Sequence, residues 1–182
     1  MVKKAIVNVT ITIPEGVEAK VDGRKVLIKG PLGRIEHDFS HAPISIKHEE
    51  GQLKVEASWP DKKINAMVGT ISSHIKNMIT GVVKGFRYKL KIVFAHFPMS
   101  IKIQNKEVLI ENFYGERRPR KAEIKGDVKV NVEGDDIIVQ GIDIMDVSQT
   151  AANIQEATRI KKRDPRVFLD GIYIFERREE SL

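Results

Sequence analysis

The spacing of apolar residues predicts two long helices, one in each half of the chain. Between residues 61 and 81, apolar side chains recur at intervals of three and four and line one face of a helix; they are Ile64, Met67, Val68, Ile71, Ile75, Met78 and Ile79. Asp61 can cap the start of this helix and Gly81 can end it. In the second half, Asp146 and Gln149 resemble a capping box. The stripe that follows them contains small residues, so this helix is expected to pack closely on its sheet: Ala151, Ala152, Ile154, Ala157 and Ile160.

Most other apolar residues alternate with polar ones and predict strands in a pattern that occurs twice. Residues 20–28 align without a gap on residues 102–110, and each segment reads as a strand, a polar turn and a second strand, which is typical of a hairpin. Gly33 and Gly115 follow at the same offset of 82 residues. Two later strands also correspond, each after an acidic turn that contains glycine: 53–55 and 137–139.

Each predicted helix is followed by a strand that glycine introduces, at 85–90 and at 171–175. We therefore expect an α+β fold that consists of two tandem copies of a small antiparallel sheet with one helix packed on it. In this interpretation the first copy spans 1–82, with its closing strand extending to about 93, and the second spans 94–182. A unit of about 80 residues buries only a small core and often depends on a partner.

Composition excludes several classes of protein. With 41% hydrophobic residues the chain is too apolar for a disordered tail, and its 31% charged residues interrupt every apolar run before membrane-spanning length. The absence of cysteine excludes disulfides, zinc knuckles, iron–sulfur clusters and thiol nucleophiles. No export signal is recognisable at the N-terminus, so the cytoplasm is the expected location.

The net charge of +6 conceals three basic segments in an otherwise acidic chain. Thirteen Lys and Arg residues and a single acid lie in the segments 84–91, 117–121 and 159–166, and the rest of the chain carries a net charge of −6. Local positive charge of this kind suits a phosphate backbone, because each neutralised phosphate releases counterions. The alternative is that these side chains are only a solvated surface.

No constellation of residues indicates catalysis. The chain has no P-loop, dinucleotide-binding, zinc-protease or serine-hydrolase motif. His37 and His41 are four apart but lie in a predicted strand and loop, and we interpret them as surface residues rather than metal ligands. The carboxylate pairs at 49–50 and 135–136 lie in exposed turns. We expect no enzymatic activity, metal, cofactor or small-molecule substrate.

Two short strings imitate nucleic-acid motifs. The GxxG string at 30–33 resembles the backbone clamp of KH domains, but strand-like segments flank it and Pro31 suits a tight turn, so we favour a hairpin. Residues 84–88 partly match the signature with which RNA-recognition motifs stack bases. Phe86 and Tyr88 are equally compatible with core positions in a strand.

The segment 159–166 is the most specific of the basic segments. It begins in the last turn predicted for the second helix, and Pro165 then forces an extended loop. The result is a basic projection between helix and strand that can contact phosphates. The alternative is that these cations only complement the helix dipole, for which one or two would suffice.

These residues together resemble a known family. SQTAANIQ at 148–155, RIKKRDPRVF at 159–168 and DGIY at 170–173 closely resemble the second domain of large-subunit ribosomal protein L6. NMITGV at 77–82 and KGFRYKL at 84–90 resemble its first domain. RDPRVF at 163–168 replaces a run typical of the bacterial branch and is similar to the archaeal and eukaryotic branch.

The resemblance implies a duplicated fold and a non-enzymatic, structural role in the large ribosomal subunit of the cytoplasm. It implies contact with large-subunit rRNA near the stalk base and the sarcin–ricin region, with neighbouring ribosomal proteins as further partners and no membrane association. The residues expected to bind rRNA are, in the loop, Arg159, Lys161, Lys162, Arg163 and Arg166, and in the inter-strand segment, Arg117, Arg118, Arg120 and Lys121.

Two other classes of function remain open on the residues alone. One is an interaction adaptor whose tandem units bind a protein partner and make no direct RNA contact. The other is a nucleic-acid-processing enzyme, against which the lack of a convergent set of His, Glu or metal-ligating residues speaks.

Overall fold

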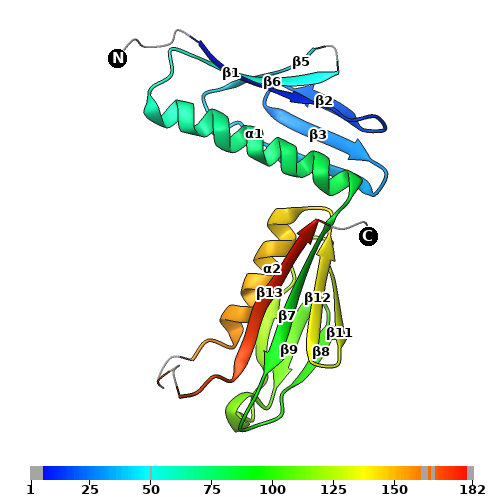
Figure 1. Cartoon of the computed structure of the whole chain (residues 1–182), viewed down its shortest axis with the longest axis vertical. Coiled ribbons are helices and arrows are strands. Elements are labelled where there is room, and N and C mark those ends of the chain that lie inside the picture. Colours follow the sequence, from blue (N-terminus) through cyan, green and yellow to red (C-terminus); the bar gives the residue numbers. More distant parts are fainter. Residues whose placement is uncertain (1–5, 50, 161–163, 165–166, 180–182) are drawn as a thin grey trace. The chain divides into compact units, whose positions relative to one another are not determined.

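The chain forms two compact units, Met1–Lys84 and Gly85–Leu182. A computed structural model describes residues 6–49, 51–160, 164 and 167–179. Over these described residues, each unit contains one α-helix and two antiparallel sheets (Figure 1). Neither of the two α-helices described combines the length and the apolarity that crossing a membrane would require.

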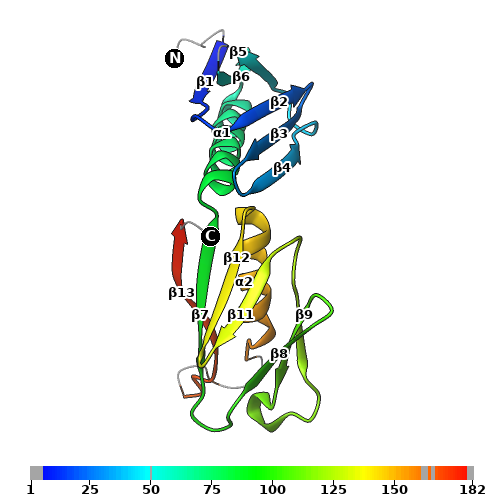
Figure 2. The same ribbon diagram turned by 90° about the vertical axis from the view of Figure 1, so that its right-hand side faces the viewer.

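The first unit has six strands in two three-stranded sheets. One sheet has the order β1-β6-β5 and the other β2-β3-β4, and every pairing is antiparallel. Figure 2 shows β2, β3 and β4 side by side. The strands are β1 (Ile6–Thr12), β2 (Glu18–Asp22), β3 (Lys25–Gly30), β4 (Gly33–Asp38), β5 (Ser45–Glu49) and β6 (Gln52–Ser58).

Helix α1 (Lys62–Val83) packs against strands of both sheets, namely β1 and β6 of one and β3 and β4 of the other. The predicted apolar stripe is its packed face: Val68, Ile71, Ile75, Met78 and Ile79 are buried. The Asp61 carboxylate accepts a hydrogen bond of 2.7 Å from the Ile64 amide, which confirms the predicted cap.

The prediction that Gly81 ends the helix is wrong. Gly81 is buried within α1, and the helix continues for two more residues. The chain leaves the helix instead at Gly85, whose φ of +80° suits the left-handed position after a helix.

The GxxG string is a hairpin turn, as expected. Gly30 pairs with Gly33 across the β3–β4 turn, and the Leu32 amide donates to the Val82 carbonyl at 3.0 Å. A Cβ atom added to Gly30 would lie 2.7 Å from Cγ2 of Val82 and 2.9 Å from its carbonyl oxygen. The glycine is therefore required for close packing of the hairpin against the end of α1, and not for a nucleic-acid clamp.

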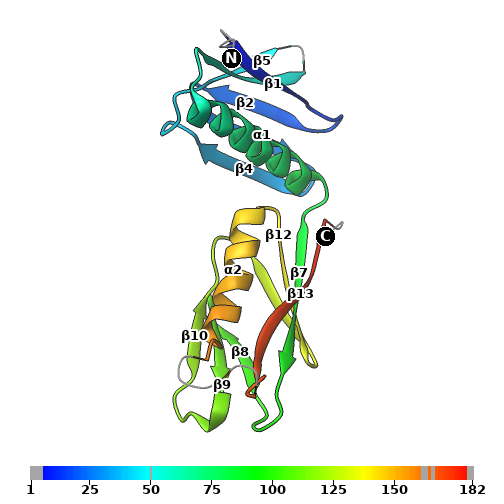
Figure 3. The same cartoon turned by 60° about the vertical axis from the view of Figure 1, so that its left-hand side comes forward.

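The second unit repeats this plan and adds a strand. Its sheets have the orders β10-β9-β8 and β11-β12-β7-β13, again antiparallel throughout. Helix α2 (Ile144–Ala157) contacts both sheets, through β10 in one and through β7, β12 and β13 in the other (Figure 3). The strands are β7 (Phe86–Val93), β8 (Ser100–Gln104), β9 (Glu107–Glu111), β10 (Arg120–Glu123), β11 (Lys129–Glu133), β12 (Asp136–Gly141) and β13 (Gly171–Glu179), with a short 3-10 turn, η1 (Phe113–Gly115).

The duplicated α+β fold is confirmed, but the strand expected to close the first copy belongs to the second. β7 pairs with β12 and β13, and the division between the units falls between Lys84 and Gly85 rather than near residue 93. β7 occupies the place that β1 has in the first unit, beside the strand that precedes the helix. The two glycine-led strands therefore pair with each other in one sheet and do not close separate copies.

The start of α2 also differs from the prediction. Asp143, and not Asp146, is the cap: its carboxylate accepts a hydrogen bond of 2.8 Å from the Met145 amide. Asp146 lies in the first turn of the helix, where its charge favours the helix dipole. Val147, Thr150, Ala151 and Ile154 are the buried residues of α2.

Candidate nucleic-acid interface

Two of the basic segments meet at the C-terminal end of α2. Nη1 of Arg120, at the start of β10, donates to the Ala157 carbonyl at 2.9 Å and to the Arg159 carbonyl at 3.3 Å. The Ala157 carbonyl is among those that a helix end leaves without an intrahelical partner, and a guanidinium satisfies it while complementing the dipole. The Arg159 carbonyl lies just beyond the helix. The segment 117–121 and the beginning of the segment 159–166 are thus neighbours.

Arg120 is also bound from its other side. Its Nε and Nη2 atoms donate to the two carboxylate oxygens of Glu116 at 2.9 and 2.7 Å, a bidentate pair. Its guanidinium lies 4.3 Å from the centre of the Phe113 ring. The hydrogen bond from Arg120 holds the pKa of Glu116 below its ordinary value. Because the guanidinium donors of Arg120 bind groups of the protein itself, we interpret Arg120 as a residue that positions the two segments. This differs from the sequence prediction, in which Arg120 contacts RNA.

The chain that leaves α2 is fastened to the chain that enters β13. The buried Thr158 hydroxyl donates to the Gln155 carbonyl at 3.0 Å and accepts from the Ile172 amide at 3.0 Å. The Gln155 side-chain oxygen accepts from the Ile174 amide at 3.0 Å. The two ends of the connection that contains the basic loop are therefore held together.

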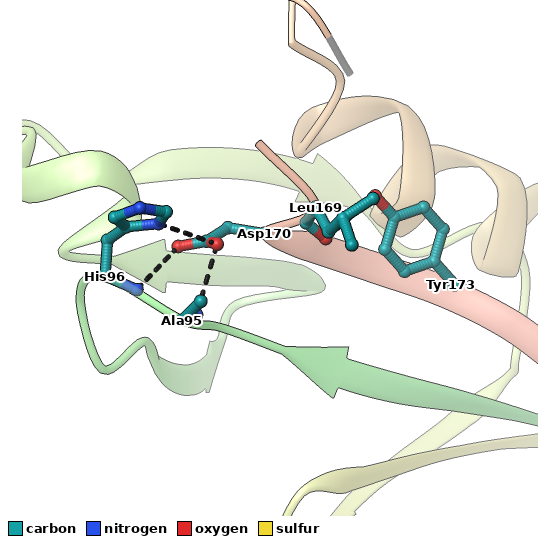
Figure 4. Close-up of polar contacts among 5 residues, drawn as sticks. All are labelled: Ala95, His96, Leu169, Asp170 and Tyr173. Atoms are coloured by element: carbon teal, nitrogen blue, oxygen red, sulfur yellow. Dashed lines mark hydrogen bonds and ion pairs between the residues drawn. The ribbon is translucent and has the colours of Figure 1, made fainter. Parts of the chain in front are cut away.

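Asp170 anchors the far end of this connection (Figure 4). Its carboxylate is buried and accepts hydrogen bonds from the Ala95 amide at 3.1 Å, the His96 amide at 3.3 Å and Nδ1 of His96 at 3.2 Å. Burial acts to raise the pKa of Asp170, but the hydrogen bonds from His96 and Ala95 outweigh it and hold the pKa below its ordinary value. Asp170 is therefore an anion at neutral pH.

Aromatic contacts of Phe168 also attach the connection between α2 and β13 to the rest of the second unit. The Phe168 ring lies 5.6 Å from the ring of His96 and 6.0 Å from that of Tyr114, centre to centre, and Tyr114 meets Phe113 edge-on at 4.7 Å. The Asp164 carbonyl accepts hydrogen bonds from the amides of Val167 and Phe168, both at 3.1 Å. Sequence reasoning missed the roles of Asp170 and Phe168, because their partners lie more than 50 residues away in the chain.

The structure describes five of the nine predicted rRNA-binding residues, and the Arg120 hydrogen bonds bring Arg120 and Arg159 together at the end of α2. Arg117, Arg118, Lys121 and Arg159 are exposed, whereas Arg120 is half-buried. Surface ion pairs join Lys121 to Glu107 at 2.8 Å and Arg159 to Glu156 at 3.1 Å. Such pairs contribute little and exchange readily for another anion. The other four predicted residues lie outside the described part of the chain: Lys161, Lys162, Arg163 and Arg166.

The basic segment 84–91 has a structural explanation. Lys89 pairs with Glu176 at 2.9 Å and Lys91 with Asp136 at 2.8 Å, so each lysine of β7 meets an acid on a neighbouring strand. The hydrogen bond to Asp136 raises the pKa of Lys91. Phe86 and Tyr88 are buried in the core, so the resemblance to a base-stacking sheet does not hold.

An open groove adjoins the residues around Lys121. The groove, of about 340 Å³, lies between β10 and α2. Across this packing, the Asn153 side chain donates to the Glu123 carbonyl at 2.9 Å, and the Thr150 hydroxyl accepts from the Lys125 amide at 3.0 Å. Within the described ranges, no three His, Asp or Glu side chains are grouped so that they could hold a metal ion.

Comparisons with known proteins match nearly the whole chain. The profile of the ribosomal protein L6 family matches residues 13–88 and 97–171. Among similar proteins named large ribosomal subunit protein uL6, that of Ignicoccus hospitalis is 51% identical over 97% of this chain and 98% of its own. That of Methanosphaera stadtmanae is 53% identical over 100% of both chains, and that of Desulfurococcus amylolyticus 54% identical over 93% and 94%. These relatives are archaeal, which agrees with the predicted branch.

Replacing Arg120 is expected to destabilise the second unit. Arg120→Ala removes hydrogen bonds to two carbonyls and one carboxylate, and we expect the free energy of unfolding to fall by about 2–4 kcal/mol. Lys121→Ala, which breaks only an exposed pair, should cost less than about 1 kcal/mol. Urea unfolding followed by circular dichroism measures both. Equal effects of the two substitutions would contradict the positioning role of Arg120.

The Asp170 anchor is expected to weaken in acid. Because the pKa of Asp170 is lowered in the folded state, its contribution is present above its ordinary pKa of 3.8 and is lost as the pH falls through the folded-state pKa. Asp170→Asn should destabilise the protein at pH 7 by about 1–3 kcal/mol, and this difference from the wild type should shrink below about pH 4. Urea unfolding of both proteins across this pH range checks the sign. A difference that stays constant with pH would show that the charge of Asp170 is not what matters.

Proposed function

The chain belongs to the ribosomal protein L6 family, and we propose on that basis that it is a structural constituent of the large ribosomal subunit that binds large-subunit rRNA through its second unit. The observation that carries the proposal is the meeting of two basic segments, distant in sequence, at the end of α2. Arg120 fixes one to the other through the Ala157 and Arg159 carbonyls.

Binding rests on phosphate contacts. Arg117, Arg118 and Arg159 are exposed and belong to the two segments that Arg120 links. A planar guanidinium contacts phosphate oxygens in a bidentate manner. In our proposal the basic loop, with Lys161, Lys162, Arg163 and Arg166, contributes further contacts. Phosphate contacts fix the position of the protein, and a paired RNA segment is recognised by its A-form shape and 2′-hydroxyl groups.

A fixed scaffold makes this contact efficient. The connection from α2 to β13 is fastened at one end by Thr158 and at the other by Asp170 and Phe168. Side chains held in place before binding lose less conformational entropy when the RNA arrives. The attachments also hold together positive charges that would otherwise repel one another in the free protein.

The proposed site in the subunit is the region of the stalk base and the sarcin–ricin segment, where GTPase factors dock. There the protein joins rRNA segments and neighbouring ribosomal proteins in the cytoplasmic ribosome and so supports translation without catalysing a reaction. Membership of a ribosomal protein family supports this structural role.

Reversing exposed charge at the interface is expected to weaken RNA binding. Arg117→Glu combined with Arg118→Glu removes two phosphate contacts, so affinity for a large-subunit rRNA fragment should fall at least ~10-fold. Reversing Lys161, Lys162, Arg163 and Arg166 together should abolish binding. Lys62→Glu combined with Lys63→Glu changes the net charge equally but lies on α1 of the first unit, and it is the matched control. Filter binding at moderate salt measures all three variants.

Salt dependence separates RNA binding from the alternative of a protein adaptor. If about six phosphates are contacted, the logarithm of the affinity should fall with the logarithm of salt concentration at a slope of about −5 for the wild type. The Arg117 and Arg118 double variant should show a slope smaller by about 2. A flat dependence, or unchanged affinity after charge reversal at the interface, would favour a protein partner instead.

A further inference from the structure

Two phenylalanine rings project from the short connection between β7 and β8, beside the proposed interface. Phe94 is 43% exposed and Phe97 is 42% exposed. They flank Ala95 and His96, the two residues whose amides Asp170 binds. Exposed large apolar side chains that adjoin a charged surface mark binding sites more often than scattered single ones do.

The backbone that carries these rings is fixed. Besides the two hydrogen bonds to Asp170, the Asn112 side chain donates to the Pro98 carbonyl at 3.0 Å (Figure 4 shows the Asp170 contacts). Asn112 itself has a φ of +60° and directly precedes η1. The connection between β7 and β8 is thus hydrogen-bonded to Asp170, which directly precedes β13, and to Asn112, which precedes Arg117 and Arg118 in the chain.

Phe97 lies directly against that segment. A Cβ atom added to Gly115 would be 3.4, 3.5 and 3.7 Å from Cε1, Cζ and Cδ1 of the Phe97 ring. Similar distances to three successive ring atoms place the glycine over a face of the ring and not at its edge. Gly115 has a φ of +74°, a conformation that L side chains rarely adopt, and Arg117 and Arg118 follow two and three residues later.

We propose that Phe97, assisted by Phe94, is a stacking site for unpaired bases of the RNA, while Arg117 and Arg118 bind the adjoining phosphates. This inference rests on the proposed function, because it names the kind of nucleotide that the second unit takes. Aromatic side chains beside basic ones are the usual means by which proteins bind unpaired nucleotides. The bases of a continuous duplex are already stacked on one another, so only an unpaired nucleotide offers a free face.

The charge beside the rings decides between RNA and an apolar protein partner. An apolar protein surface would bury the rings but would leave Arg117 and Arg118, both exposed, at its border without a matching anion. A nucleotide carries both a ring face and a phosphate. The ring of Phe97 can stack on the base while the guanidinium groups of Arg117 and Arg118 bind the phosphate, because the segments that carry them are hydrogen-bonded to each other.

The test compares variants of the full chain bound to large-subunit rRNA. Acylation of 2′-hydroxyl groups reports how constrained unpaired nucleotides are, and hydroxyl-radical cleavage reports protection of the backbone. With Phe97→Ala, we expect unpaired nucleotides that the wild type constrains to regain reactivity, backbone protection to remain, and affinity to fall about 10-fold. Phe97→Tyr keeps a stacking face and should behave as the wild type does. Trp59→Ala removes an exposed aromatic ring from the first unit and is the matched control.

Each outcome separates this inference from the proposed function. If Phe97→Ala leaves both the constraint on unpaired nucleotides and the affinity unchanged while backbone protection is present, the stacking site is overturned and RNA binding stands. If the wild type protects no backbone at all, RNA binding by the second unit fails and the stacking site fails with it. Phe97→Leu retains apolar packing against Gly115 without an aromatic face, so it decides the question if the alanine variant does not fold. Behaviour of Phe97→Leu like the wild type would overturn the proposal.

Discussion

The bonding of Arg120 is the interaction on which the proposed interface depends. One guanidinium binds the Glu116 carboxylate, covers the Phe113 ring and donates to carbonyls at the end of α2. A helix end needs donors for its last carbonyls, and a cluster of arginines needs to be held against its own repulsion. Arg120 meets both needs at once, so the fold and the charge pattern of the second unit are linked through a single side chain.

The two units build the same plan differently at the ends of their helices. In the first, α1 has 22 residues, its end is met by the backbone amide of Leu32, and the chain passes directly to β7. In the second, α2 has 14 residues, its end is met by a charged side chain, and a connection leads on to the additional strand β13. In both units the helix ends against a three-stranded sheet. In the first unit this end packs closely against Gly30, and in the second it is bound by the basic residue Arg120.

Local patterns predicted the elements well, and contacts between distant residues explain where they fell short. The period of the α1 stripe and the cap at Asp61 are properties of consecutive residues, and the structure confirms them. The assignment of β7 to the first unit was wrong because two strands that follow a helix and a glycine look alike in sequence. Only the pairing of β7 with β12 and β13 distinguishes them.

The candidate site likewise combines features that are visible in the sequence with contacts between distant residues. Charge counting identified the segments 117–121 and 159–166, since charge is visible in the residues themselves. It could not show that Arg120 donates hydrogen bonds to Glu116 and to a carbonyl 37 residues away. Nor could it show that Asp170 accepts hydrogen bonds from amides more than 70 residues away. Nor could it separate β7, whose lysines pair with Glu176 and Asp136, from the exposed Arg117, Arg118 and Arg159.

The proposed contact between rRNA and the surface at the end of α2 must exist in the assembled particle. Its most direct test is photo-cross-linking within assembled large subunits, with a photoreactive amino acid introduced at position 118 and, for comparison, at position 63 on α1. We expect cross-links from position 118 to large-subunit rRNA, at nucleotides close to the sarcin–ricin region. Cross-links from position 118 to protein alone would contradict it.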